Sequence, residues 1–253
     1  MLAVWTLLAL TALAVLVTYS RLPPEKLYHT SVDGLAGGLG RALVVVNFPV
    51  ALVAIAIVLV CAGRGRGGLV TAASWLAVGL CLVVVVPGVV DQDDLDARWV
   101  NALPGLGVAI AAGLTWLARP GLSWSPRAPG DRIRLVLAAV LLVGAIPWVF
   151  AETGFYAPDP ILADEVPSGE TIAAVHLGHH HGTDGVLLAL SALLLSRTLG
   201  SLVALSHKVI VSFYLALMLA YGAANAAQDF WLEQVVKRGW TERGIPSVLN
   251  PKL

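Results

Sequence analysis

Charged side chains are scarce in this sequence. Asp, Glu, Lys and Arg make up 13% of its 253 residues, whereas 58% of the residues are hydrophobic. A soluble domain usually carries about 25% charged residues. The formal net charge is zero, and no basic cluster is interleaved with aromatic residues, so nucleic acid is not an expected partner. The composition predicts an all-α fold, a polytopic membrane helical bundle.

Cysteine and the familiar catalytic patterns are also scarce. Cys61 and Cys81 both lie inside apolar runs, at a spacing that fits neither a disulfide framework nor a metal site. No GxSxG, CxxC or nucleotide-binding glycine pattern occurs in a fitting context. We therefore expect no nucleotide cofactor, and we interpret both cysteines as small core residues.

Long apolar runs dominate what is present. They predict one integral membrane domain over residues 1–253 that ends in an amphipathic tail, 228–253. We interpret the first run as an anchor helix, since it lacks a basic start; if it were cleaved, six spans would be left. Pro147 is expected to bend the fifth span. The seven predicted transmembrane helices are residues 2–18, 42–61, 69–90, 103–118, 135–150, 171–197 and 209–227.

The basic residues of the short connectors predict the orientation in the cell membrane. The connectors after the third and fifth spans hold Arg98 as their one basic residue. The connectors after the second, fourth and sixth spans hold Arg64, Arg66, Arg119, Arg127, Arg132, Arg134, Arg197 and Lys208. Basic loops favour the cytoplasm, so the N-terminus is predicted inside and the C-terminus outside.

Four of the six histidines lie in one stretch, Ser168–Arg197. If this stretch is a helix from residue 171 onward, His176, His180 and Asp184 share one face at i, i+4 and i+8. The i, i+4 histidine pair is a spacing by which a helix offers two nitrogens to one metal ion. The opposite face is rich in glycine, which favours close helix packing in a membrane.

Carboxylates collect at the same predicted membrane level as the histidines. Ionisable groups at this depth are costly unless they pair, bind an ion or face water, so we predict a shared, outward-opening, water-filled cavity. In the alternative reading, the acids of the last span pair with Lys237 or Arg238. The candidate catalytic residues are Glu152, Asp184, Asp94, Asp229 and Glu233.

Zinc suits a site of nitrogen and carboxylate ligands. Two ligand sets are open: His176, His180 and Asp184, or the more compact His176, His179 and His180, which we prefer. Asp184 would then support the site or carry a proton. The run His176–His180 locally resembles the HxxxH pattern of seven-span metal-dependent hydrolases such as alkaline ceramidases and adiponectin receptors. It lies here in the sixth span instead of the last, and it does not place the chain in that family.

Three functions fit these features. The first is a membrane hydrolase or transferase with an outward-facing, zinc-dependent site that acts on a membrane lipid or a lipid-linked cell-envelope substrate. The second is a proton- or ion-coupled transporter that uses Asp184 and the histidines. The third is a non-catalytic subunit or assembly factor that binds a protein partner through the C-terminal tail, 228–253.

Overall fold

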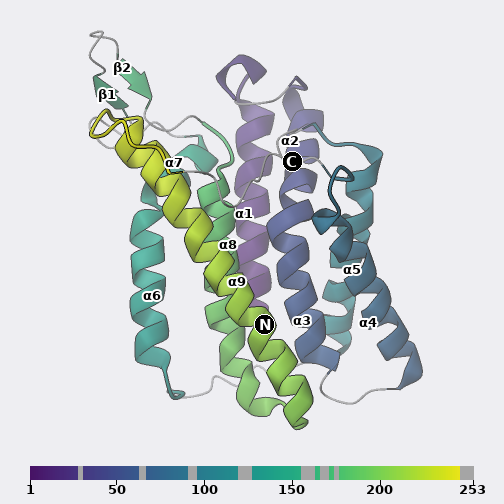
Figure 1. The fold of residues 1–253 in the computed structure, drawn as a ribbon. Coiled ribbons are helices and arrows are strands. Elements are labelled where there is room, and N and C mark those ends of the chain that lie inside the picture. Colours follow the sequence, from purple (N-terminus) through teal and green to yellow (C-terminus); the bar gives the residue numbers. More distant parts are fainter. Residues whose placement is uncertain are drawn as a thin grey trace.

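The computed structural model describes residues 1–27, 31–62, 67–90, 96–118, 127–154, 163–165, 171–173 and 177–245. Regular structure in these residues is almost entirely helical (Figure 1). The helices are α1 (Leu2–Arg21), α2 (Gly34–Val45), α3 (Ala51–Ala62), α4 (Gly68–Cys81), α5 (Ala102–Ala118), α6 (Asp131–Gly144), α7 (Ile146–Thr153), α8 (His181–Ser196) and α9 (Leu205–Trp231). Two short strands, β1 (Ala163–Glu165) and β2 (Thr171–Ala173), pair as one antiparallel hairpin.

Six helices in the described chain are long and apolar enough to cross a membrane, which confirms the predicted helical membrane bundle. Short 3-10 or π turns extend several of them; the turn Val46–Val50, for example, joins α2 to α3. The six spans are Leu2–Arg21, Gly34–Ala62, Gly68–Val85, Trp99–Ala118, His181–Ser201 and Leu205–Val236. The seventh predicted span and the direction of the termini are still predictions.

The candidate seventh span is broken in the middle. α6 and α7 are long and apolar enough to cross a membrane only when they are taken together, and they meet at an angle of 55°. Pro147 lies in the first turn of α7. Proline lacks an N–H and clashes with the carbonyl one turn earlier, so it ends α6 and starts a new axis. The bend expected at Pro147 is confirmed, and it places Glu152 near the end of α7.

The prediction of a helix from residue 171 onward is wrong. Residues Thr171–Ala173 belong to β2, and α8 begins only at His181. Gly178 has a φ of 115°, a left-handed conformation that favours glycine, and Leu177 pairs as an isolated β-bridge with Leu27. This long-range pairing helps to keep the chain out of helical structure before α8.

α8 and α9 cross at a contact between glycines. A methyl group added to Gly185 would lie 2.5 Å from the carbonyl oxygen of Gly222, and one added to Gly222 would lie 2.5 Å from the carbonyl oxygen of Gly185. Only glycine at both positions allows the two backbones to come this close. The crossing aligns the start of α8 with the end of α9, where the polar residues lie.

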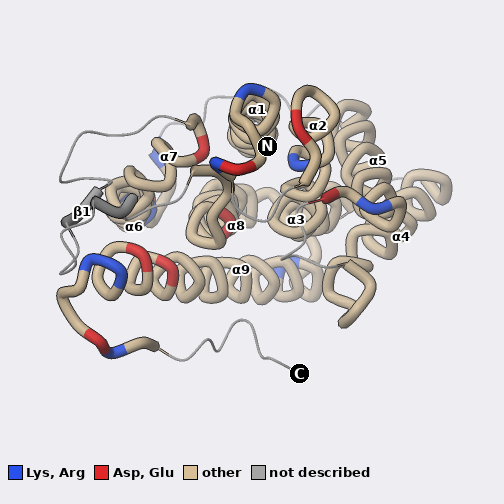
Figure 2. Tube along the Cα trace, turned by 90° about the horizontal axis from the view of Figure 1, so that it is seen from above, with Lys and Arg blue, Asp and Glu red and all other residues tan. Residues whose placement is uncertain are grey.

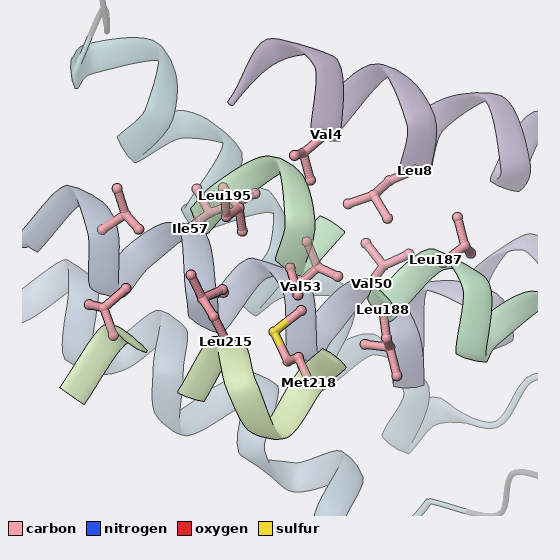
Figure 3. Close-up of a cluster of buried hydrophobic side chains, with 14 of the residues drawn as sticks. Val4, Leu8, Val50, Val53, Ile57, Leu187, Leu188, Leu195, Leu215 and Met218 are labelled. Atoms are coloured by element: carbon pink, nitrogen blue, oxygen red, sulfur yellow. The ribbon is translucent and has the colours of Figure 1, made fainter. Parts of the chain in front are cut away.

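The core joins the first span to the last two (Figure 3). Val4 and Leu8 of α1, Val53 and Ile57 of α3, and leucines and a methionine of α8 and α9 belong to one buried cluster. These side chains are almost fully buried. Dispersion contacts of this kind hold helices together in a membrane, where lipid removes the hydrophobic driving force.

Charged residues are confined largely to the helix ends (Figure 2). Acidic positions are visible on α8 and at the end of α9. In Figure 1, α9 runs obliquely across α8, and its end lies at the same level as α7 and the start of α8. This end of the bundle holds the candidate site.

Candidate functional site

Buried charged residues gather at the end of the bundle where α1, α7 and α9 end and α8 begins. In the chain described, the buried charged side chains include Glu152, Asp184 and Glu233, together with Arg41 and His180. This is the pooling that the sequence predicts for the helix ends on one side. Since unpaired charges are costly at this depth, their partners define what the site can do.

The His179 imidazole lies between two carboxylates. Its Nδ1 is 2.6 Å from Oε1 of Glu152, and its Nε2 is 2.6 Å from Oδ1 of Asp184. Burial favours the neutral ring, but the charges of Asp184 and Glu152 outweigh that effect and raise the pKa of His179 well above its ordinary value. An imidazolium that donates to both carboxylates is the form this geometry favours. We name these three residues the His179 array.

The end of α1 forms hydrogen bonds with the backbone of His179 and Glu152. The backbone N–H of His179 donates to the hydroxyl of Tyr19 over 3.2 Å, and Thr18 donates to the carbonyl of Glu152. A methyl group on Gly178 would lie 2.4 Å from the Tyr19 hydroxyl, so glycine is needed here both for its φ and for space. The end of α1 thus fixes the extended turn that presents His179.

The next residue along, His180, turns to the other side and meets α9. His180, Asp229 and Glu233 each offer a ligand atom, and these three atoms lie within 4.8 Å of one another. Nδ1 of His180 lies 4.0 Å from Oδ2 of Asp229. The side chain of His180 is 1% exposed, that of Glu233 is 9% exposed and that of Asp229 is 14% exposed. We name this group the α8–α9 site.

Backbone contacts hold the α8–α9 site in place. The N–H of Gly182 donates to Asp229 Oδ2 over 2.8 Å, and Asn225 Nδ2 donates to the carbonyl of His181 over 2.9 Å. Asp229 lies in the last turn of α9, and Glu233 follows four residues later in the π turn Leu232–Val236 that continues this helix. Oε2 of Glu233 is buried and has no hydrogen-bond partner. A buried carboxylate oxygen with a free lone pair is the kind of atom that an ion would satisfy.

The donor set fits a divalent transition metal. Zinc accepts imidazole nitrogen and carboxylate oxygen at about 2.0–2.2 Å, so tetrahedral ligand atoms lie about 3.4 Å apart. The observed separations are wider than this by little more than 1 Å, which side-chain rotation can close. Three protein ligands would leave one position for water or substrate, as in catalytic zinc sites.

The structure regroups the residues predicted from sequence. The predicted metal set joined His179 to His180, but the two belong to different groups, and both ring nitrogens of His179 lie against carboxylates. Glu152 and Asp184 join the His179 array, whereas Asp229 and Glu233 join the α8–α9 site. His176 and Asp94 lie outside the described residues. The helical spacing assumed for the histidines does not apply here, because α8 begins only at His181 and His180 is in extended backbone, with φ −123° and ψ 144°.

Sequence reasoning missed Tyr19 and Arg41 at this end of the bundle. Arg41 is 1% exposed, its guanidinium lies 5.5 Å from the centre of the Tyr19 ring, and its Nη2 donates to Asp96 Oδ1 over 2.6 Å. Burial alone would raise the pKa of Asp96, but hydrogen bonds from Ser31 and Arg41 lower it below its ordinary value. An arginine inside an otherwise apolar segment was the available signal.

Two buried asparagines, Asn47 and Asn101, form a further polar contact next to α5. Asn47 Nδ2 donates to the carbonyl of Asn101 over 3.1 Å, and Asn101 Nδ2 donates to Asn47 Oδ1 over 3.0 Å. Both side chains are buried. Reciprocal amide bonds satisfy these polar groups and tie the π turn of the second span to the start of the fourth.

No protein-family model matches this chain, and comparisons with curated proteins and with solved structures find no match. The side chains themselves therefore carry what can be inferred about function.

Proposed function

We propose that this protein is an integral membrane enzyme that binds zinc at His180, Asp229 and Glu233 and acts on a lipid or a lipid-linked substrate. The single observation that carries the proposal is the α8–α9 site: three buried donor side chains whose ligand atoms lie within 4.8 Å of one another. Two of its members were expected as catalytic carboxylates and one as a metal ligand.

The supporting chemistry is that of an open metal site. A zinc ion held by three protein ligands lowers the pKa of a bound water and polarises a carbonyl or phosphoryl oxygen. The role of the chain is to shield the three ligand side chains from bulk water and to fix their relative positions. The Gly185–Gly222 crossing and the Gly182 N–H bond to Asp229 do this.

The substrate class is inferred from where the site lies. It is formed at the ends of two spans, so it is placed near the level of lipid headgroups. Exposed aromatic side chains occur close by, with Trp240 at 72% and Phe230 at 40% exposure. Such residues are enriched at membrane interfaces. A molecule with an apolar tail and a polar head can approach a site at this depth from the bilayer.

Metal analysis of the purified full chain tests the first half of the proposal. We expect about one zinc per chain in the wild type and under a tenth of that in His180→Ala and in Asp229→Asn. His207→Gln is the control, since His207 belongs to the other end of α9 and contacts the carbonyl of Leu59. Equal zinc content in all four proteins would rule out the α8–α9 site.

A lipid turnover assay tests the second half. Wild type and Asp229→Asn are each placed in vesicles made from a total membrane lipid extract, and the lipids are compared by mass spectrometry with and without added zinc. We expect at least one lipid species to be consumed by the zinc-loaded wild type only. Identical lipid profiles would contradict an enzymatic role while leaving the metal site standing.

A further inference from the structure

A lysine competes for one ligand of the α8–α9 site. Nζ of Lys237 lies 2.5 Å from Oε1 of Glu233, four residues earlier. The Lys237 side chain is 52% exposed, whereas that of Glu233 is 9% exposed. The ammonium therefore reaches inward on a flexible stem and pairs with a buried carboxylate, which would otherwise carry an uncompensated charge.

We propose that Lys237 is the internal counter-ion of the α8–α9 site and that it determines which metal ions enter. This inference depends on the proposed function, because it assigns a role at the same site. The ammonium and a metal ion are both cations that need the Glu233 carboxylate. Since half of the Lys237 side chain is exposed, the ammonium can swing into water when an ion takes its place.

The competition favours transition metals over hard cations. An entering ion must offset the loss of the Lys237–Glu233 pair as well as its own dehydration. Magnesium and calcium prefer all-oxygen coordination and gain little from the His180 imidazole, whereas zinc binds imidazole nitrogen strongly. Lys237 thus lowers the affinity for every ion, and the ions that already bind weakly are excluded.

The next residue offers a matched control. Arg238 carries the same charge and follows Lys237 directly. Its guanidinium donates to the neutral amide oxygen of Gln234, over 2.9 Å from Nη2. Its removal changes the net charge by the same amount as removal of Lys237 without freeing a carboxylate of the site.

The experiment is a calorimetric titration of zinc into the purified full chain in detergent. We expect Lys237→Met to bind zinc about tenfold more tightly than the wild type, because an ion that enters the wild type must first break the Lys237–Glu233 pair. Arg238→Met should stay within about threefold of the wild type, since exposed charges contribute little. Lys237→Arg, which keeps the charge, should bind no more tightly than the wild type.

A magnesium titration of the same proteins reads out selectivity. We expect measurable magnesium binding in Lys237→Met and none in the wild type. Thermal unfolding of each variant checks that it is folded, and Lys237→Gln replaces Lys237→Met if the latter does not fold.

The outcomes separate the two proposals. If the wild type binds zinc and Lys237→Met binds it equally or less tightly, the inference is overturned and the proposed function stands. If only Lys237→Met binds zinc, the inference is supported and the wild type is a lysine-filled site without a metal. If no protein binds zinc, both proposals are overturned.

Discussion

His179 is the residue on which the buried charge balance depends. One imidazole contacts Glu152 and Asp184 at 2.6 Å each, and the two carboxylates are almost fully buried. A carboxylate in this position is tolerated only with a partner. Because one ring contacts two acids, its loss would leave both carboxylates without this partner.

Replacing His179 by glutamine should therefore destabilise the fold. We expect His179→Gln to cost about 3 kcal/mol, since breaking a buried ion pair leaves an uncompensated charge. Thermal unfolding in detergent measures this. His181→Gln, at an exposed position of the same histidine run, is the control and should change little. An unchanged midpoint for His179→Gln would show that the two carboxylates do not need the imidazole.

The pH dependence of stability has a definite sign. The pKa of His179 is raised in the folded protein, so the folded state holds its proton more tightly than the unfolded state. The stabilisation is complete below a pH of about 6.5, the ordinary value, and is lost as pH rises through the higher folded pKa. We expect the thermal unfolding temperature of the wild type to decrease as the pH is raised from about 7 to about 9. We expect a smaller decrease in His179→Gln. A wild-type midpoint that rose over this range would contradict the assignment.

At the scale of elements, α9 was predictable and the start of α8 was not. Asp229 and Glu233, both predicted as candidate catalytic residues, are four residues apart, and the structure places them in one group. Helical spacing failed for His179 and His180 because Leu177 pairs with Leu27, about 150 residues away in the chain. Such a long-range contact leaves no periodic trace in a single sequence.

Only one of the two helix faces that pack together in the α8–α9 contact could be predicted from the sequence. A glycine-rich face on the sixth span was predicted, but its partner Gly222 could not be identified, since a small-residue stripe does not say which helix it meets. The grouping of His180 with Asp229 depends on this partner. The sequence therefore grouped His180 with His176 and His179, whereas the structure groups it with Asp229 and Glu233.

The glycine contact gives a test at this scale. Gly185→Val should prevent close packing, because its Cβ would lie 2.5 Å from the Gly222 oxygen. We expect loss of about 3 kcal/mol of stability or failure to fold, in the range of overpacked cores. Gly79→Ala is the control: its added methyl group meets nothing within 4 Å, so it should be neutral or slightly stabilising. Equal stability of the two variants would contradict the close crossing.

At the scale of the whole molecule, the polarity is one-sided. The buried charged side chains in the described chain, Arg41, Glu152, His180, Asp184 and Glu233, lie toward the end of the bundle where α7 and α9 end. The opposite end carries a partly exposed cluster of Asp131, Arg134 and Arg197. The candidate site therefore lies at one end of the bundle.

Cysteine labelling tests which surface that is. We expect Glu242→Cys, just beyond α9, to react with a membrane-impermeant maleimide on intact cells. Ser201→Cys, at the opposite end between α8 and α9, should react only after permeabilisation. The native Cys61 and Cys81 are buried and give a low background. The reverse labelling pattern would place the candidate site at the cytoplasmic surface.

The most direct measurement is X-ray absorption at the zinc edge on the purified full chain. We expect one imidazole nitrogen and two carboxylate groups at about 2.0–2.2 Å from the zinc, and we expect this signal to be lost in Asp229→Asn. A zinc ion bound by two or more imidazoles, or a signal that is the same in Asp229→Asn, would contradict the assignment of His180, Asp229 and Glu233 as its ligands.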